Sequence, residues 1–288
     1  MDLTDTLYHY CGIGNFLSII RSKEIWLSSL NLSNDFKEGR MVRETILRLA
    51  RDKNLPESTQ QRLVDSLKFF DTSLHGLGFC LSEKGDLLSQ WRGYAEDAFG
   101  VSIGFNREFL KKLALQNNLG FNQIAYDQSQ HDEILSSIFQ NLWESIKNGA
   151  FSIPGSLTYS FSPDSAKRPE QAALTSTETN DPLTKFAKEL LKITSSLFEL
   201  KGADFREEFE WRLISLLPYH PSEKCLFRMS KNRIIPYRIF TMEKYSCPII
   251  NEVVLGPKQE TPIEVVQSLL EQAGFSNVTV RNSDASYR

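Results

Sequence analysis

The sequence predicts an α+β protein with mostly antiparallel sheets and flanking helices. Segments with the two-residue alternation of β-strands and segments with the 3.6-residue period of helices are interspersed along the chain. They do not follow the regular strand–helix–strand order that predicts a parallel sheet. The 288 residues contain no internal repeat, and their number allows one large domain or two small ones.

Strands are expected where polar and apolar residues alternate, or where turn residues bound a short apolar run. In chain order these are residues 7–10, 25–28, 77–82, 101–105, 124–126, 205–217, 233–238, 245–255 and 278–280. The polar segment after the second strand contains Asn34 and Asp35 and is followed by Glu38. We expect it to form a turn-rich loop, because Asn and Asp side chains hydrogen-bond their own backbone in turns.

Helices are expected where apolar residues recur every three or four positions. In chain order these are residues 16–22, 40–70, 89–94, 106–115, 134–146, 183–200 and 261–273. Pro56 divides the second of these segments into two helices, and Pro262 stands at the first helical position of the last one. Residues 151–182 are rich in Ser, Thr, Pro and Asn without a sustained period, so we expect a loop or lid there.

The composition narrows the class of protein. Hydrophobic residues make up 41% and charged residues 24% of the chain, which is typical of a folded globular protein. The net charge of −3 argues against a broad nucleic-acid-binding surface. The four cysteines lack the spacing of a CxxC pair or a zinc finger, so we expect reduced thiols and no metal site. Because no apolar run approaches the roughly 20 residues of a membrane span and no basic signal-peptide region is present, we expect a cytoplasmic protein without membrane binding.

The most informative stretch is residues 205–217, Phe-Arg-Glu-Glu-Phe-Glu-Trp-Arg-Leu-Ile-Ser-Leu-Leu. Successive side chains of a strand point to opposite faces, so its alternating aromatic and aliphatic residues are expected on one face. Glu208 and Glu210 lie two positions apart and are expected side by side on the other face. Two neighbouring carboxylates at the start of an apolar strand indicate a functional site. The alternative is an edge strand whose polar face meets water.

Four pieces of the sequence together resemble a known family. They are Leu7-Tyr8-His9-Tyr10 with Asn34, Asp35 and Glu38; Cys80-Leu81-Ser82-Glu83 with residues 89–94 and 100–105; residues 205–212; and Val254-Leu255-Gly256-Pro257. In this order and at these separations they resemble the bacterial family catalogued as domain of unknown function 2971. The resemblance spans nearly the whole chain, which implies one domain over residues 1–288. The family name carries no activity with it.

A more distant likeness is to the ADP-ribosyltransferase fold, which binds NAD in a cleft between two small sheets. In that superfamily a first strand supplies His or Arg, a second strand supplies Ser or an aromatic residue, and a late strand supplies the catalytic Glu. Here His9 matches the first position, Ser82 or Tyr94 the second, and Glu208-Phe209-Glu210 the third. The chain departs from that pattern because no Ser-Thr-Ser triplet stands on the second strand. The likeness implies a split sheet and an enzyme that consumes NAD.

The likeness also implies a role for each acidic or basic residue of the pattern. Glu210 would stabilise the positive charge that develops on the ribose as the nicotinamide bond breaks. Glu208 would act as a general base for the acceptor. His9 would donate a hydrogen bond to a ribose hydroxyl. The structural alternative for His9 is a strand histidine whose hydrogen bonds are satisfied within the protein.

Residues 89–94 would complete the NAD site. Tyr94 or Trp91 would stack on the nicotinamide ring, and Arg92 would pair with the pyrophosphate through its fork of donors. The structural alternative is that Trp91 and Tyr94, which stand at helical spacing, belong to the core. Arg92 would then be a surface residue or an ion-pair partner.

The likeness thus implies an ADP-ribosyltransferase-like enzyme, such as a toxin or antiphage defence effector that modifies a nucleic acid or a protein. One alternative is a metal-dependent nuclease whose Mg²⁺ is held by four carboxylates, those of Asp35, Glu38, Glu208 and Glu210. No Lys stands at a familiar spacing after the Glu pair, and the acidic net charge does not favour DNA binding. The other alternative is a non-catalytic module that senses a ligand or binds a partner protein in a polar cleft.

Overall fold

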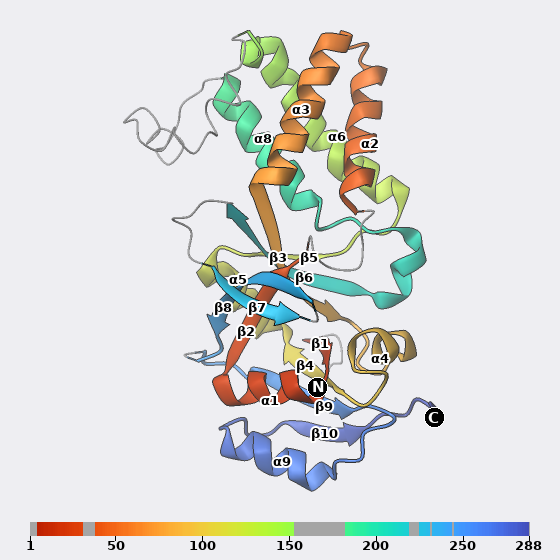
Figure 1. The fold of residues 1–288 in the computed structure, drawn as a ribbon, viewed down its shortest axis with the longest axis vertical. Helices are drawn as coiled ribbons and strands as arrows, with labels where there is room; N and C mark the ends of the chain where they lie inside the picture. The colour runs from red at the N-terminus through yellow and green to blue at the C-terminus, as the bar shows by residue number, and fades with distance from the viewer. Residues whose placement is uncertain are drawn as a thin grey trace.

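The computed structural model describes residues 5–30, 38–152, 182–218, 225–230, 232–243 and 245–287. Helices flank an open, mostly antiparallel sheet, which confirms the predicted α+β class (Figure 1). Among the paired strands of the described residues, β9 and β10 are the parallel pair. No helix within these residues is both long and apolar enough to cross a membrane.

The sheet consists of two groups of strands that are joined by one residue pair. The first group runs in the order β10 (Thr279–Asn282), β9 (Ile250–Leu255), β4 (Val101–Asn106) and β1 (Thr6–Cys11). The second runs in the order β7 (Leu226–Ser230), β8 (Arg233–Thr241), β2 (Glu24–Ser29), β3 (Leu74–Ser82), β6 (Glu210–Pro218) and β5 (Gly120–Gln123). Between β1 and β3, the register pairs Tyr8 with Ser82. The two groups therefore diverge on either side of this pair.

Four helices form a layer at one end of the molecule, at the top of Figure 1. They are α2 (Glu38–Asp52), α3 (Glu57–Ser73), α6 (Gln128–Ser145) and α8 (Pro182–Ser196). Ile46, Leu63 and Phe186 are fully buried in the apolar core between them. The removal of such side chains from water is the main favourable term in folding, and it holds this layer together.

The other helices lie along the sheet. They are α1 (Ile13–Ser22), α4 (Leu88–Tyr94), α5 (Arg107–Asn117) and α9 (Ile263–Gln272). Phe16 and Ile20 of α1 are buried in the core of the sheet, as the predicted helical face requires. Asn106 begins α5 as expected for an N-cap, because its side chain accepts hydrogen bonds from two backbone N–H groups of the first turn.

Most predicted elements are confirmed, with several differences, one of which concerns the start of β6 and is described with the site. The strand predicted at residues 124–126 is wrong, because β5 ends at Gln123 and Ala125 forms an isolated bridge with Leu200. The apolar side chains of residues 124–126 are buried by packing, without a ladder of strand hydrogen bonds. The strand predicted from residue 245 begins at Ile250, and β7 was not predicted. Within the loop or lid expected at residues 151–182, residues 153–181 lie outside the described part of the chain.

Candidate functional site

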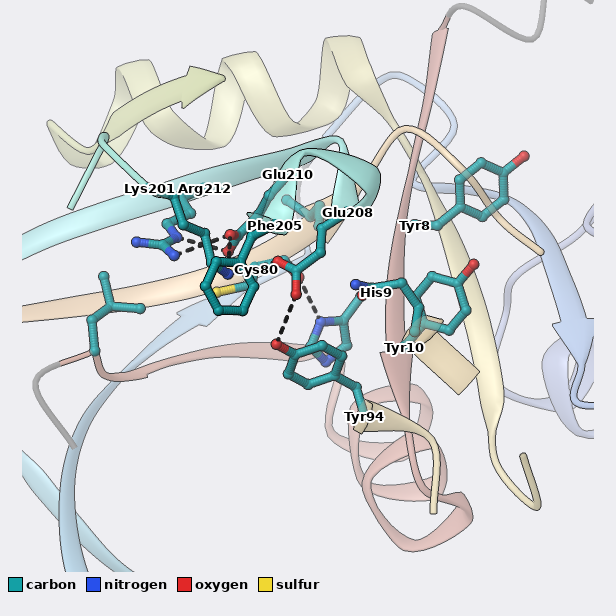
Figure 2. A pocket seen from close by; sticks show the side chains of 13 residues that line it. Tyr8, His9, Tyr10, Cys80, Tyr94, Lys201, Phe205, Glu208, Glu210 and Arg212 are labelled. Carbon is teal, nitrogen blue, oxygen red and sulfur yellow. Dashed lines mark hydrogen bonds and ion pairs between the residues drawn. The ribbon is translucent and has the colours of Figure 1, made fainter. Parts of the chain in front are cut away.

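A cavity of about 240 Å³ lies where the two groups of strands diverge (Figure 2). Its polar wall comes from β1, β3, α4 and the segment that leads into β6, through His9, Cys80, Tyr94, Lys201, Glu208 and Glu210. Figure 2 shows Tyr8 and Tyr10 pointing to the other side of β1 from His9. The alternation of side chains along β1 therefore sends His9 alone of these three toward the carboxylates.

Four charged side chains, which we call the charge cluster, meet at this wall. The ammonium nitrogen of Lys201 lies 2.6 Å from Oε2 of Glu208 and 3.2 Å from Oε2 of Glu210. Arg212 donates to both oxygens of Glu210, over 2.7 Å and 3.0 Å. Each of the four residues is less than 10% exposed. Buried charges require partners, and here two cations face two carboxylates.

The charge cluster keeps Glu210 and Lys201 ionised. Burial alone would raise the pKa of Glu210, but Arg212 and Lys201 outweigh that effect and hold the pKa below its usual range. Burial alone would lower the pKa of Lys201, but the two carboxylates outweigh it and raise the pKa. Burial and the charge of Glu210 raise the pKa of the neighbouring Cys80 thiol. Cys80 is therefore a neutral thiol at neutral pH and lacks the thiolate of a nucleophilic cysteine.

The prediction that Glu208 and Glu210 share a strand face is wrong. Ala203–Glu208 forms a 3₁₀ helix, Phe209 has a left-handed backbone with φ of 46°, and β6 begins at Glu210. The alternation of a strand therefore applies from Glu210 onward and does not reach Glu208. Lys201 nevertheless brings the two carboxylates together. Oε1 of Glu208 accepts a long hydrogen bond of 3.4 Å from the Tyr94 hydroxyl, which links it to α4.

His9 enters the cavity from β1 as a neutral imidazole. Desolvation lowers the pKa of His9 to about 4, although its hydrogen bond to the Cys80 backbone opposes the shift. Nδ1 lies 2.9 Å from the Cys80 carbonyl oxygen, and it carries the proton because a carbonyl oxygen only accepts. Nε2 is then an acceptor at neutral pH. The predicted donation from His9 to a ribose hydroxyl is therefore reversed, since the hydroxyl would have to donate to Nε2.

Three other residues of the predicted site do not line the cavity. Ser82 is 2% exposed, and its hydroxyl donates to the backbone carbonyl of Glu208 over 2.6 Å, so it supports the turn that presents that carboxylate. Trp91 is completely buried, and Arg92 is exposed and lies over an aromatic ring of the C-terminal segment. Tyr94 does lie at the cavity wall. The structure therefore brings together His9, Tyr94 and the two glutamates.

The comparison with protein families finds a match over part of the chain. A model of the family described as Protein of unknown function (DUF2971) matches residues 90–213. This confirms the predicted family resemblance. No curated protein and no solved structure matches the chain.

The DUF2971 match covers one part of the site. It runs from α4 to β6 and contains Tyr94 and the whole charge cluster. It does not reach β1, which carries His9, or the motif at residues 254–257. The match is therefore shorter than the near-complete resemblance that the four sequence pieces predict.

Sequence reasoning missed two basic residues of this region. Lys201 lies between α8 and the 3₁₀ helix, and its backbone N–H donates to the Ala125 carbonyl. Its sequence signal is weak, because a single lysine next to a glycine is typical of a surface turn. Arg228 lies on the unpredicted strand β7 and lines a second cavity of about 300 Å³. That cavity shares part of its wall with the first one, namely His9, Tyr10, Cys80 and Tyr94.

The carboxylates of the nuclease alternative do not form a metal site in the described part of the chain. Within those residues, no group of three or more His, Cys, Asp or Glu side chains could hold a metal ion. Glu208 and Glu210 instead pair with Lys201 and Arg212. Two further residues were expected at this site. Asp35 lies outside the described residues, and Glu38 is the first residue of α2.

Proposed function

We propose that the chain is an NAD-consuming enzyme of the ADP-ribosyltransferase type, which modifies a nucleic acid or a protein. The observation that carries this proposal is that His9, from the first strand, meets Glu208 and Glu210 in one cavity. His9 stands at the first and the two glutamates at the third of the three positions at which the sequence resembles the ADP-ribosyltransferase pattern. A toxin or an antiphage defence effector would use such an activity.

The strand register supports the proposal. Tyr8 pairs with Ser82, and Ser82 pairs with Glu210. Because neighbouring strands lie about 4.8 Å apart, the backbones of Tyr8 and Glu210 are about 10 Å apart. His9, which follows Tyr8, is one residue out of that register, but its side chain points from the diverging strand β1 toward the cavity that Glu210 also lines. The divergence of the two strand groups at this point also agrees with a cleft between two sheets.

In the proposed reaction, the bond between ribose C1′ and nicotinamide N1 breaks. Its electron pair leaves with nicotinamide, whose ring charge it neutralises. The positive charge left on the ribose is stabilised by Glu210, which Arg212 and Lys201 hold ionised and fixed in place. An acceptor hydroxyl or amine, or water, then bonds to C1′ and gives its proton to Glu208. Nε2 of His9 accepts a hydrogen bond from a ribose hydroxyl.

The first test is nicotinamide release from NAD by purified protein, with cell extract and nucleic acid as acceptors. We expect release by the wild type. Glu210→Gln should lower the rate by about 10²–10³-fold and Glu208→Gln by about 10²–10⁴-fold. Glu189→Gln is the matched control, because Glu189 is also a partly buried, lysine-paired glutamate but lies on α8 and does not line the cavity.

Circular dichroism and thermal melts of each variant separate a loss of chemistry from a loss of fold. A wild-type protein that releases no nicotinamide with any acceptor would refute the proposal. Equal rates for the wild type and both cavity variants would also refute it, because the chemistry would then not depend on these carboxylates.

The second candidate, a non-catalytic module that senses a ligand, is favoured by one observation. The four charges of the charge cluster already neutralise one another, so the cluster can be a structural support for a binding cavity. In that case NAD or another nucleotide would raise the melting temperature without nicotinamide release. The release assay and the melts therefore decide between the two candidates.

A further inference from the structure

We propose that the second cavity binds a 5′-phosphorylated nucleoside, with the phosphate on Arg228 and the base against Trp26. If NAD is the substrate, as the proposed function requires, this is the site for its adenosine monophosphate half. The cavity has a volume of about 300 Å³ and lies between α1, β2, β3 and β7. Tyr94 lines both cavities, so one extended ligand that occupies both would contact it.

Arg228 is the cation of this cavity. Its Nε and one terminal nitrogen donate to the hydroxyl of Ser28 over 3.3 Å and 3.2 Å. The residue is half-buried, and among the described residues no carboxylate forms an ion pair with it. A guanidinium has five N–H donors, so the Ser28 contact leaves donors for an anion. Phosphate matches the fork of a guanidinium, and hydrogen bonds between such charged partners are the strong ones.

Trp26 supplies an aromatic surface beside this cation. It lines the cavity and is half-buried. The indole stacks on Tyr237, with 4.6 Å between ring centroids and 29° between planes. Its N–H donates to Glu24 over 3.1 Å, which fixes the ring. Aromatic side chains that are held in this way stack on nucleobases, and the carboxylate of Glu24 can accept from ribose hydroxyls.

The sheet aligns these residues with the charge cluster. Glu24, Trp26 and Ser28 alternate along β2 and therefore share one face. Ser28 pairs with Gly78 of β3, and two residues along that strand Cys80 pairs with Arg212 of β6. Paired residues of neighbouring strands point to the same side of a sheet. One face thus runs from the charge cluster, across β3 and β2, to Arg228.

The polar residues of α1 complete the cavity. Asn15, Ser18 and Ser22 follow one another at spacings of three and four, so they lie on one side of the helix, and all three line the cavity. Phe16 and Ile20 occupy the buried side. A helix side of small polar groups that faces a cavity suits a ligand with hydroxyl and phosphate oxygens. Together the two cavities fall within the about 300–1,000 Å³ that ligand sites occupy in proteins.

The test is calorimetric titration of the full chain with adenosine monophosphate. We expect wild-type binding, a loss of affinity of about tenfold to a hundredfold in Arg228→Ala, and a smaller loss in Arg228→Lys, which keeps the charge but not the fork. Arg21→Ala is the matched control, because Arg21 is an exposed arginine of the adjacent helix α1 that does not line the cavity. Its affinity should equal that of the wild type.

The same titrations separate this inference from the proposed enzyme. Binding of adenosine monophosphate that depends on Arg228, without nicotinamide release, would support the nucleotide site and refute the enzyme. Nicotinamide release with the same KM for NAD in the wild type and in Arg228→Ala would support the enzyme and overturn the nucleotide site. The absence of adenosine monophosphate binding to the folded wild type, or equal binding by Arg228→Ala, would also overturn it.

Discussion

Lys201→Met should destabilise the protein by about 3–5 kcal/mol, because it removes one cation from a buried cluster of two carboxylates and two cations. Lys201 is 4% exposed, and its ammonium contacts both Glu208 and Glu210. Met has a similar length and keeps the apolar stem packed, so the loss is mainly electrostatic. In a chain of this size, the melting temperature should fall by about 6–20 °C.

The loss should depend on pH. In the wild type, the pKa of Glu210 lies below its usual range, because the cations outweigh the effect of burial. A carboxyl whose folded pKa is depressed contributes stability that is present above its unfolded pKa of about 4.3 and is lost as the pH falls through the folded pKa. The contribution of Lys201 to the free energy of unfolding is lost over the same pH range, because a protonated carboxyl carries no charge for the ammonium to pair with. The free-energy difference between wild type and Lys201→Met should therefore be largest at neutral pH and shrink below about pH 4.

Urea unfolding at pH 7 and at about pH 3 measures this difference, and Lys192→Met is its control. Lys192 also lies 2.6 Å from a glutamate oxygen, that of Glu189, but its side chain is 58% exposed. Exposed ion pairs contribute little, so Lys192→Met should cost less than about 1 kcal/mol. If Lys201→Met costs no more than Lys192→Met at pH 7, the charge cluster is not the buried electrostatic unit described here.

Two further predictions concern His9 and Gly256. Burial lowers the pKa of His9 from about 6.5 in the unfolded chain to about 4 in the folded protein, so about 3 kcal/mol of stability should be lost as the pH falls from about 6.5 toward 4. His9→Asn should flatten that part of the urea-unfolding profile, and equal pH dependence in both proteins would contradict the neutral imidazole. Gly256→Ala should destabilise the fold by about 1–3 kcal/mol or more, because a Cβ would lie 2.4 Å from the Ala98 carbonyl oxygen. Gly14→Ala on α1, where nothing lies within 4 Å, should leave the melting temperature unchanged or raise it, and an equal effect of both variants would contradict the packing argument.

The periodicity of the sequence predicted most elements because those elements bury one regular face. β1 and α1 are examples, since their buried side chains follow the two-residue and the 3.6-residue pattern. β7 has the opposite pattern: Phe227 and Met229 are 66% and 82% exposed on a strand at the edge of the sheet. The sequence of β7 therefore lacks the alternation of buried and exposed residues that predicts a strand. It forms a strand because it pairs with β8.

Without the family likeness, the site was predictable where its chemistry is concentrated in a short stretch. Glu208 and Glu210 stand out as charges beside an apolar strand, and the structure places both at the cavity. Their partner Lys201 stands seven and nine residues before them but has no local pattern, because its position depends on the isolated bridge between Leu200 and Ala125. Trp91 shows the reverse case, since an aromatic residue at helical spacing turned out to be buried core. Spacing along the chain cannot tell whether such a residue lines the cavity or belongs to the core, because that depends on tertiary packing.

The division of the sheet explains why the site draws on distant segments. β1 pairs with β3 through one residue pair and then leaves it, so the edge of β3 between that pair and its pairs with β2 has no strand partner among the described residues. β6 lies along the far side of β3 and brings the charge cluster to this opening, while β2 and β7 bring Trp26 and Arg228. The DUF2971 match contains the charge cluster but neither β1 nor β7. The residues that match the family should therefore account for the charge cluster. The choice of ligand should depend on His9, Trp26 and Arg228, which lie on strands outside the match.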